Sequence, residues 1–365
     1  MAAFGFVLSL ALAIAIAAFY KAVVRLSPIH PSPIILPPPV PLTGPFTPNS
    51  LLSSNLRRLG NGLLPFPEDL VADAHGSLFV ACGDGWIKRL DPSSDTVENF
   101  AFLGEGRRPL GITLGREGEL IVCDPDVGLL NVTKDKIELL SDEADGVKFR
   151  LTDAAAVSMQ DGSIYFSDAS SRYSFANHYT GMMDISPDGR LLKYDGVRRK
   201  TTTLIDGLYF ANGVALSRDE DFLVVCETAQ ARCHRYWLKG EKQGQSEVFI
   251  DRLPALPDNI KIDGKGHFWI ALVSARPFYM DWILRFPFIR QLHEVLGLTE
   301  MSIKMMSKRA LVLEVTEEGK PVRTLGDPMG ASISLVTTAY VVDDDLYLGS
   351  LNVDFLGHVK LNATT

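Results

Sequence analysis

The sequence predicts an all-β chain folded as a six-bladed β-propeller, preceded by an apolar helix and interrupted by a helical insertion. The prediction depends on one recurring pattern: a polar pair, an alternating apolar strand, a turn rich in Asp and Gly, and a second apolar strand. Most copies are roughly 40 to 60 residues apart, which is the period of propeller blades. A β-sandwich also has many short strands, but it does not repeat one motif in this way. The six copies begin at Pro67, Pro109, Thr152, Ala211, Pro257 and Ile333.

Composition excludes one large class of partner. Of the 365 residues, 46% are hydrophobic and 22% are charged, which is ordinary for a globular protein with a large core. The 44 acidic and 36 basic residues give a net charge of −8, and no basic tract is present. Because binding to phosphates needs clustered Lys and Arg, we expect no nucleic-acid partner.

The N-terminus has a different composition from the rest. Residues 2–20 contain no charge, and as a helix they would span roughly 28 Å, close to the hydrocarbon thickness of a bilayer. We expect residues 1–26 to be a transmembrane signal anchor that holds the protein on a membrane through residues 2–20. The alternative is a cleaved signal peptide, for which "AIAA" resembles a cleavage site.

Two features disagree about orientation. Lys21 and Arg25 follow the apolar segment, and the positive-inside rule would place that side in the cytosol. The sequons at Asn131 and Asn362 have meaning only in the secretory lumen, where they would be glycosylated. We expect a lumenal body in the endoplasmic reticulum or vacuole, and the sequence leaves both orientations open.

The remaining chain divides into a linker and a body. Residues 27–48 are so rich in proline that they favour an extended spacer, and residues 49–365 form the propeller. Within the body, residues 276–309 are aromatic and rich in Met, with a helical pattern. We expect this insertion to lie between blades 5 and 6. It is either a helix packed on the rim or a lid that covers the central site or contacts the membrane.

The four cysteines show no metal-binding spacing. Cys82, Cys123 and Cys226 lie in apolar strands, where a small buried side chain is the expected role. Cys226 and Cys233 flank one turn, which permits a disulfide without requiring it.

Asn212-Gly213 is not placed where a hairpin needs a turn. The hairpin fits better at residues 218–221, so Asn212 lies at the beginning of a strand. In a propeller the innermost strand of each blade points one end at the central channel, so the polar pairs that open the copies converge there. Carboxylates and an amide in such a ring are ligands that Ca²⁺ accepts, although they would also serve as strand caps. These positions hold Glu68 and Asp69, Thr152 and Asp153, Asn212, and Asp258 and Asn259.

Four segments carry a family resemblance: "PEDLVAD", "FANGVALSRDEDFLVVCETAQARCHRYWLKG", "LPDNIKID" and "DDLYLGSLNVDFLGHVKL". Together they resemble the strictosidine synthase-like family, over roughly residue 49 to the C-terminus. The resemblance implies a six-bladed propeller within a wider group that includes paraoxonases, gluconolactonases and related Ca²⁺-dependent hydrolases.

The chain departs from the family at the catalytic base. Strictosidine synthase uses a glutamate to condense an amine with an aldehyde, and the matching position falls at Thr337 or Thr338. No carboxylate occurs between Asp327 and Asp343. Threonine does not act as a general base near neutral pH. We therefore expect residues 49–365 to form no product from tryptamine and secologanin, as checked by chromatography of the reaction mixture; robust product formation would overturn this interpretation.

The resemblance also implies a metal set. Matching the pattern of the hydrolases gives Glu68, Asn212 and Asp258 as Ca²⁺ ligands. The hydrolases commonly have Asn-Asp where this chain has Thr152-Asp153, so one amide ligand is lost, and Asp153 is the candidate catalytic residue. Strictosidine synthase itself is not known to need a metal, so the family does not decide whether Ca²⁺ binds.

These observations lead to three function hypotheses. The leading one, which the resemblance implies, is a hydrolase of a small ester or lactone. A serine hydrolase with a GxSxG elbow and a protein with a phosphate-binding glycine loop are not indicated, because neither motif is present. The second is a propeller that binds a small molecule or a partner without turnover. The third is an amine–aldehyde condensing enzyme that uses another base. The sequence does not identify the substrate or the oligomeric state.

Overall fold

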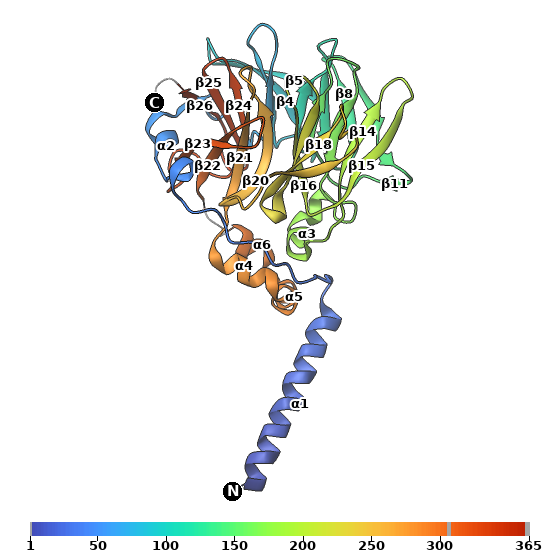
Figure 1. Ribbon diagram of the computed structural model, residues 1–365, viewed down its shortest axis with the longest axis vertical. Helices are drawn as coiled ribbons and strands as arrows, with labels where there is room; N and C mark the ends of the chain where they lie inside the picture. The colour runs from blue at the N-terminus through green and yellow to red at the C-terminus, as the bar shows by residue number, and fades with distance from the viewer. Residues whose placement is uncertain (1, 305–307, 362–365) are drawn as a thin grey trace.

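The computed structural model describes residues 2–304 and 308–361 and has six four-stranded antiparallel sheets arranged as the blades of a propeller (Figure 1). This arrangement confirms the predicted all-β fold. In blades 1 to 5 the four strands pair in chain order, each with the next, whereas in blade 6 β24, β25 and β26 pair in chain order and β1 pairs with β26.

The first three blades follow one another along the chain, with a two-stranded hairpin before the third. Blade 1 consists of β2 (Asp69–Ala72), β3 (Leu78–Ala81), β4 (Trp86–Asp91) and β5 (Thr96–Phe102). Blade 2 consists of β6 (Ile112–Leu114), β7 (Leu120–Asp124), β8 (Gly128–Val132) and β9 (Ile137–Ser141). The hairpin is β10 (Glu143–Ala144) with β11 (Val147–Lys148). Blade 3 consists of β12 (Thr152–Val157), β13 (Ile164–Asp168), β14 (Gly189–Asp195) and β15 (Lys200–Leu208).

The last blade takes its outer strand from the beginning of the chain. Blade 4 consists of β16 (Ala211–Leu216), β17 (Phe222–Glu227), β18 (Arg232–Trp237) and β19 (Ser246–Ile250). Blade 5 consists of β20 (Ala255–Ile262), β21 (His267–Ala275), β22 (Ala310–Thr316) and β23 (Pro321–Asp327). Blade 6 consists of β24 (Val336–Val342), β25 (Asp345–Ser350), β26 (Leu356–Lys360) and β1 (Arg57–Leu59). The pairing of β1 with β26 closes the ring and removes a free edge between its ends.

Each of the six sequence copies corresponds to the first two strands of one blade, and the Asp/Gly-rich turn joins them. In blade 4, for example, Ser217 Oγ accepts the N–H groups of Asp221 and Phe222 and so closes the predicted hairpin. The side chains of neighbouring blades pack against each other; between blades 4 and 5 the rings of Phe249 and Phe268 lie 5.5 Å apart.

Gly213 is required by the close approach of two strands. A Cβ at this position would lie 2.5 Å from Ile260 N and 2.6 Å from Asp258 O, both in β20 of the next blade. Asn212-Gly213 is therefore within β16 and not in a turn, as the sequence predicted. The glycine lets β16 approach β20, and this contact brings the Asn212 side chain beside Asp258.

Helices cover one end of the propeller. The predicted insertion forms α4 (Phe278–Arg285), α5 (Pro287–Val295) and α6 (Thr299–Lys304). It lies inside blade 5, between β21 and β22, and not between blades 5 and 6 as expected, because the sequence copies mark only the two inner strands of each blade. The segment after β13 adds a turn of 3₁₀ helix, η2 (Phe175–Asn177), and α3 (His178–Asp184). We call α3 and α4–α6 together the cap.

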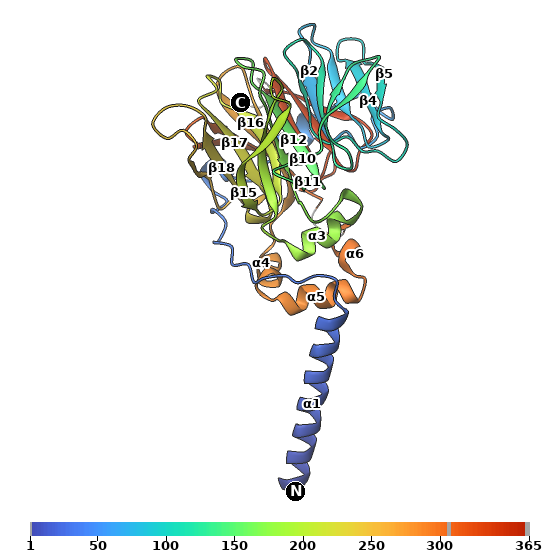
Figure 2. The ribbon, with the colours of Figure 1, turned by 90° about the vertical axis from the view of Figure 1, so that its right-hand side faces the viewer.

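The N-terminal segment runs along the cap. Helix α1 (Ala2–Leu26) projects away from the propeller, and the cap lies between the two in both views (Figures 1 and 2). The proline-rich segment that follows packs on the cap, where Ile34 and Leu36 are buried against Leu284 of α4. This segment leads through η1 (Gly44–Phe46) and α2 (Leu51–Asn55) to β1. One further turn of 3₁₀ helix, η3 (Thr228–Gln230), lies in blade 4 between β17 and β18.

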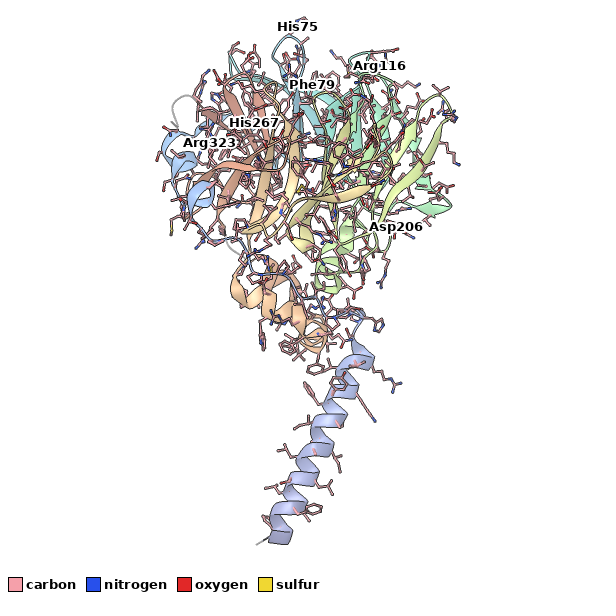
Figure 3. All side chains as sticks on the ribbon, viewed as in Figure 1. His75, Phe79, Arg116, Asp206, His267 and Arg323 are labelled. Carbon is pink, nitrogen blue, oxygen red and sulfur yellow. A yellow bond between two sulfur atoms is a disulfide. The ribbon has the colours of Figure 1, made fainter. Side chains whose placement is uncertain are left out.

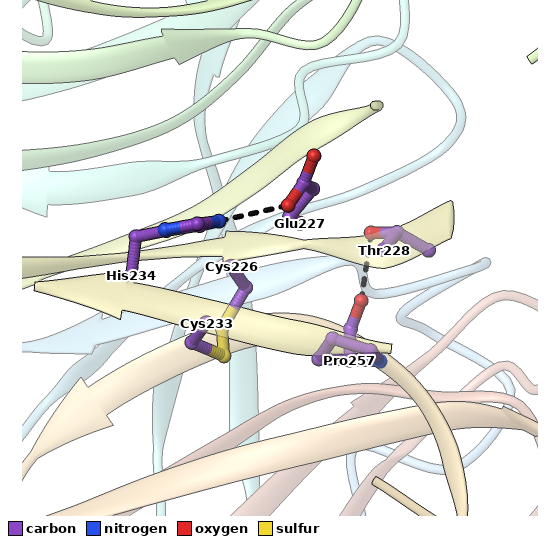
Figure 4. Close-up of a disulfide and its surroundings, with 6 residues drawn as sticks. All are labelled: Cys226, Glu227, Thr228, Cys233, His234 and Pro257. Carbon is purple, nitrogen blue, oxygen red and sulfur yellow. Dashed lines mark hydrogen bonds and ion pairs between the residues drawn. A yellow bond between two sulfur atoms is a disulfide. The ribbon is translucent and has the colours of Figure 1, made fainter. Parts of the chain in front are cut away.

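Cys226 and Cys233 form a disulfide (Figure 4). They face each other directly in the pairing of β17 with β18, so the spacing that permitted a bridge in the sequence corresponds to a cross-strand pair. Cys82 and Cys123 are free and buried, as expected for small side chains in apolar strands.

Candidate active site

The inner strands all begin at the cap end of the propeller. Ala255 at the start of β20 pairs with Ala275 at the end of β21, just before α4. Thr152 at the start of β12 likewise pairs with Asp168, after which the chain continues to α3. The turns that join the inner strands lie at the other end, where His75 and Arg116 are visible far from α1 (Figure 3). Residues that open the inner strands therefore lie beneath the cap.

Four buried carboxylates meet at this end. Glu68 precedes β2, Asp69 begins it, Asp153 lies in β12 and Asp258 in β20. Burial raises the pKa of Glu68 well above its usual value, and the charges of Asp258, Asp69 and Asp153 raise it further. Burial and the charge of Asp258 likewise raise the pKa of Asp153. Burial also raises the pKa of Asp258 to about 7. The structure thus brings together three of the four predicted site residues through their charges.

The fourth predicted residue, Asn212, joins them through a hydrogen bond. Its amide group bonds to the Asp258 carboxylate, which lowers the pKa of that carboxyl against the larger effect of burial. Asn259, the other amide of the cluster, donates from Nδ2 to Glu68 Oε1 over 3.0 Å. Both amides therefore use their N–H groups on carboxylates, and the Asn212 carbonyl oxygen remains directed elsewhere.

Within the part of the chain that the structure describes, several buried oxygens of this cluster have no hydrogen-bond partner. A buried acceptor without a donor is costly, so a group of them in one place indicates a site for something electropositive. Four of these atoms are carboxylate or amide oxygens, which only accept hydrogen bonds, and the fifth is a hydroxyl oxygen. Oxygen atoms of these kinds are ligands that suit Ca²⁺. The residues present therefore fit the ion. The unpartnered atoms are Glu68 Oε2, Asp69 Oδ1, Asp153 Oδ1, Asn212 Oδ1 and Thr338 Oγ1.

A fixed cation already neutralises part of the cluster. Lys261 Nζ lies 2.6 Å from Asp69 Oδ2 and 3.3 Å from Ile112 O, and the Ile112 N–H donates to the same Asp69 oxygen. Sequence reasoning missed Lys261 and the unpartnered Asp69 Oδ1. The available signal was the lysine in "NIKID", which stands between two isoleucines inside a strand where a solvated side chain is not expected.

Two of the three threonines at the site, Thr152 and Thr337, donate hydrogen bonds to backbone carbonyl oxygens. Thr152 Oγ1 donates to Asp124 O over 2.6 Å, so it does not replace the amide that the hydrolase pattern has at this position. Thr337 Oγ1 donates to Glu68 O over 2.6 Å. Thr338 is buried, and its hydroxyl is one of the unpartnered atoms. No carboxylate stands at either position, which agrees with the interpretation that the condensing base is missing.

A cation flanked by aromatic rings lies near the cluster. The Arg108 guanidinium lies 5.6 Å from the ring centres of both Phe66 and Phe175, the second of which belongs to η2 beside the cap. The charge of Arg108 lowers the pKa of Glu68, against the larger effects that raise it. Burial lowers the pKa of His178, and Arg108 contributes to the same shift. Arg108 and His178 were not singled out as site residues, because nothing local in the sequence places them here.

A second acidic group lies away from the cap. One ligand atom from each of Asp263, His267 and Glu314 lies within 4.8 Å of the others. His267 is visible in Figure 3 well away from α1. Trp269 Nε1 donates to Asp263 Oδ2, and Arg323 Nε donates to Glu314 Oε2. Hydrogen bonds within the protein therefore satisfy these carboxylates, in contrast to those beneath the cap.

Two buried ion pairs support the strands around the site. Arg190 Nη2 lies 2.6 Å from Asp168 Oδ2, while Asp168 Oδ1 accepts the N–H of Leu151, just before Thr152 and Asp153. In blade 4, Glu227 accepts from Arg232 and bonds to His234 (Figure 4). Burial raises the pKa of Glu227, but the bonds to His234, Arg232 and the Tyr209 N–H together outweigh it, so the pKa is lowered. A carboxylate with these partners has a structural role.

Two family profiles and several individual proteins match the sequence of the chain. A strictosidine synthase profile matches residues 153–241, and a profile for the strictosidine synthase-like N-terminal region matches residues 44–90. Protein STRICTOSIDINE SYNTHASE-LIKE 7 of Arabidopsis thaliana is 41% identical over 300 residues, which cover 80% of this chain and 78% of its own. The adipocyte plasma membrane-associated protein of Gallus gallus is 34% identical over 374 residues, which cover 97% of this chain and 89% of its own.

Solved structures share the fold at low sequence identity. The gluconolactonase XC5397 of Xanthomonas campestris superposes with a TM-score of 0.60 and 15% identity, covering 91% of this chain and 98% of its own. Regucalcin of Agrobacterium tumefaciens, described as a calcium-binding protein, gives a TM-score of 0.57 and 12% identity, covering 83% and 92%. At these identities the comparisons support the propeller fold and nothing finer.

Proposed function

Because this chain belongs to the strictosidine synthase-like family, we propose that it is a propeller hydrolase that opens a small ester or lactone in the channel beneath the cap. The missing glutamate at Thr337 and Thr338 argues against amine–aldehyde condensation, and the solved gluconolactonase on the same fold supports hydrolysis. Propellers serve many functions, so the proposal depends on the site and not on the fold alone.

The observation that supports it most is the group of unpartnered oxygens. Glu68, Asp153 and Asn212 each direct a buried oxygen with no donor to the same end of the channel, and Asp258 is hydrogen-bonded among them. We propose that Glu68, Asn212 and Asp258 hold Ca²⁺ there. The calcium-binding neighbour on the same fold supports this choice of ion. When bound, Ca²⁺ would supply a positive charge that favours the oxyanion of an attacked carbonyl.

Asp153 is the residue that we propose moves the proton. Burial raises the pKa of Asp153, which makes this carboxylate a stronger base than an ordinary one, whereas a Ca²⁺ ion beside it would lower that pKa again. Asp153 would take a proton from water as the oxygen of that water bonds to the carbonyl carbon. When the carbon–oxygen bond of the ester or lactone breaks, the same proton would pass from Asp153 to the leaving oxygen, so no other reactant is needed.

Arg108 and the rings around it would orient the substrate. Phe66 and Phe175 hold the guanidinium near the cluster, where it can face a polar group of the substrate while the rings contact its apolar part. Lys261 would hold the Asp69 side chain in place beside Ile112.

An activity assay with matched variants tests the proposal. We expect the purified full-length chain to hydrolyse members of a panel of aryl esters and γ- or δ-lactones with Ca²⁺, and to lose the activity with chelator. Asp258→Asn should lower kcat by about 100-fold or more, the usual effect of losing a group that stabilises the transition state. Asp263→Asn is the control, because Asp263 is equally buried at the other end of β20 and belongs to the second acidic group.

The main alternative is a propeller that binds without turnover. It is favoured if the protein binds Ca²⁺ but leaves every ester and lactone of the panel intact. If Asp263→Asn abolishes hydrolysis and Asp258→Asn does not, the proposed site is wrong.

We also propose that α1 anchors the protein in a membrane of the secretory pathway, with the propeller in the lumen. Residues 4–26 are long and apolar enough to span a bilayer. The disulfide supports an oxidising compartment. One relative is named for association with the plasma membrane. The compartment itself, whether endoplasmic reticulum or vacuole, is part of the proposal.

Glycosylation tests the orientation. Asn131 is half-buried in β8 and lines a surface cavity of about 340 Å³ at the end of blade 2 remote from the cap, while Asn362 lies outside the described residues. We expect glycosidase treatment to increase the gel mobility of the protein from microsomes, and Asn131→Gln with Asn362→Gln to abolish the change. Protease sensitivity in intact microsomes, without a glycan, would support the cytosolic orientation that Lys21 and Arg25 favour.

A further inference from the structure

The cap has an apolar surface that no other part of the described chain covers. Tyr279, Trp282 and Phe286 are 46%, 53% and 44% exposed, and they follow one another at intervals of three and four residues in and just after α4. That spacing places them on one face of the helix. The rings of Trp282 and Phe286 lie 5.0 Å apart. Leu284, on the other face, is buried against the proline-rich segment. Helix α4 is therefore amphipathic, with its apolar face outward.

This surface is continuous with the helix that we propose enters the bilayer. Helix α1 contacts α5, and the Phe288 ring stacks on Tyr20 at 5.0 Å and meets Phe19 edge-on at 6.2 Å. Tyr20 and Lys21 are where the uncharged part of α1 ends. Aromatic rings and the first charges mark the level of the lipid headgroups. The contact with α1 thus puts α5, and α4 beside it, at the height of the membrane surface.

Hydrogen bonds fix the cap to the chain as it leaves α1. Arg290 of α5 is buried and donates to Asp184 O over 3.1 Å and to Ser32 O. Gln291 Nε2 donates to Ile29 O, and the His30 N–H donates to Asp184 Oδ1. These bonds join α3, α5 and the first residues after α1 into one unit. The tilt of the cap relative to α1 is therefore set by the protein and not by a free tether.

We propose that α4 and α5 lie in the headgroup region of the same bilayer that α1 enters, with Tyr279, Trp282 and Phe286 in contact with lipid. Trp and Tyr are the residues that favour this region, and an amphipathic helix parallel to the membrane buries its apolar face there. Arg285, exposed on the same helix, is positioned for lipid phosphates. A second copy of the chain or a partner protein on this surface is an outcome that the test separates from lipid.

The proposal has a consequence that depends on the proposed function. The inner strands begin at the cap end, so the channel would open toward the membrane and not toward the aqueous lumen. The substrate class would then be an apolar ester or lactone that partitions into lipid and reaches Arg108 along the cap.

Fluorescence quenching by brominated lipid tests the contact without any assay of activity. The full-length chain is reconstituted into phosphatidylcholine–phosphatidylserine vesicles with bromine atoms near the headgroup end of the acyl chain. Trp282 is the exposed member of the four tryptophans, and Trp269 is buried. We expect quenching of up to about one quarter of the total emission, which Trp282→Phe abolishes and Trp237→Phe leaves in place.

Equal quenching in the wild type and in Trp282→Phe would overturn the proposal. So would a blue-shifted Trp282 that bromine does not quench, because that result means that protein covers the surface. A second experiment tests the substrate class with the triple variant Tyr279→Ser, Trp282→Ser and Phe286→Ser. We expect its hydrolysis of a long-chain ester dissolved in vesicles to fall at least several-fold, and its hydrolysis of a water-soluble short ester to stay unchanged. Absence of all hydrolysis contradicts the proposed function and leaves the quenching result valid.

Discussion

Calcium is expected to raise the melting temperature of the purified full-length chain by roughly 5 to 10 °C when it is present at about 100 times its dissociation constant. The physical reason is the set of buried oxygens beneath the cap. Glu68, Asp153 and Asp258 repel one another in the absence of a cation, and Glu68 Oε2 and Asp153 Oδ1 have no hydrogen-bond donor. A bound cation would remove both costs in the folded state only. Differential scanning fluorimetry with Ca²⁺ and with chelator measures the rise.

Glu68→Gln should remove most of this rise. The substitution deletes one charge and puts an amide N–H group where only acceptors lie, so the ion would lose a ligand and meet a donor. Glu314→Gln is the matched control: Glu314 is also buried, but it is ion-paired to Arg323 at the other acidic group. It should lower the melting temperature equally with and without Ca²⁺. A wild-type melting curve that responds to neither Ca²⁺ nor chelator would contradict the proposed metal site. It would favour the alternative of a propeller that binds a ligand without turnover.

The rise should also depend on pH. In the metal-free protein the pKa of Asp258 is about 7 in the folded state, against 3.8 for an ordinary Asp, so the folded state binds its proton more tightly than the unfolded state. Stability from this group is therefore present below pH 3.8 and is lost as the pH rises toward 7. The raised pKa values of Glu68 and Asp153 act in the same direction. Because Ca²⁺ would displace these protons, its stabilising effect should grow from pH 5.5 to pH 8.

The repeated pattern predicted most of the fold because each copy is a local unit. An inner hairpin needs an alternating strand, a turn and a second strand, and all three are read within about 20 residues. The closing strand β1 could not be predicted in this way. Its three residues, Arg57–Leu59, show no alternation, and they form a strand only because β26, almost 300 residues later, offers a free edge. The insertion was recognised as helical, but its place within blade 5 depended on outer strands that carry no shared motif.

The candidate site was predictable to the extent that it repeats with the blades. Glu68, Asp153, Asn212 and Asp258 open inner strands, so the fold brings them together. Lys261 follows Asp258 by three residues in β20, and its role depends on the distance to Asp69 in another blade. Arg108 lies before β6, and its place follows from rings in a loop and in η2. The lysine in "NIKID" indicates a buried cation but not its partner, and nothing in the local sequence indicates the place of Arg108.

Arg190→Ala is expected to destabilise the protein by about 3 to 5 kcal/mol, the usual effect of removing one partner of a buried ion pair. Arg190 and Asp168 are both buried, and their charged atoms lie 2.6 Å apart. Without the guanidinium, Asp168 would keep a charge in the interior with no cation to offset it. The melting temperature should fall by roughly 10 °C. Arg198→Ala is the control, because Arg198 is paired with Asp195 at the exposed end of the same blade and should change stability by less than about 0.5 kcal/mol.

Two further measurements separate loss of the ion pair from loss of packing. Burial already raises the pKa of Asp168 against the opposing effect of Arg190, so in Arg190→Ala this carboxyl should take up a proton more readily. The deficit relative to the wild type should therefore shrink from pH 8 to pH 5.5, whereas a packing defect would be the same at both. Asp168 also accepts the Leu151 N–H, and this bond fixes the start of β12, where Asp153 lies. Arg190→Ala should for that reason reduce the stabilisation by Ca²⁺, and Arg198→Ala should leave it unchanged; an unaltered Ca²⁺ effect in Arg190→Ala would mean that Asp153 is held in place without this ion pair.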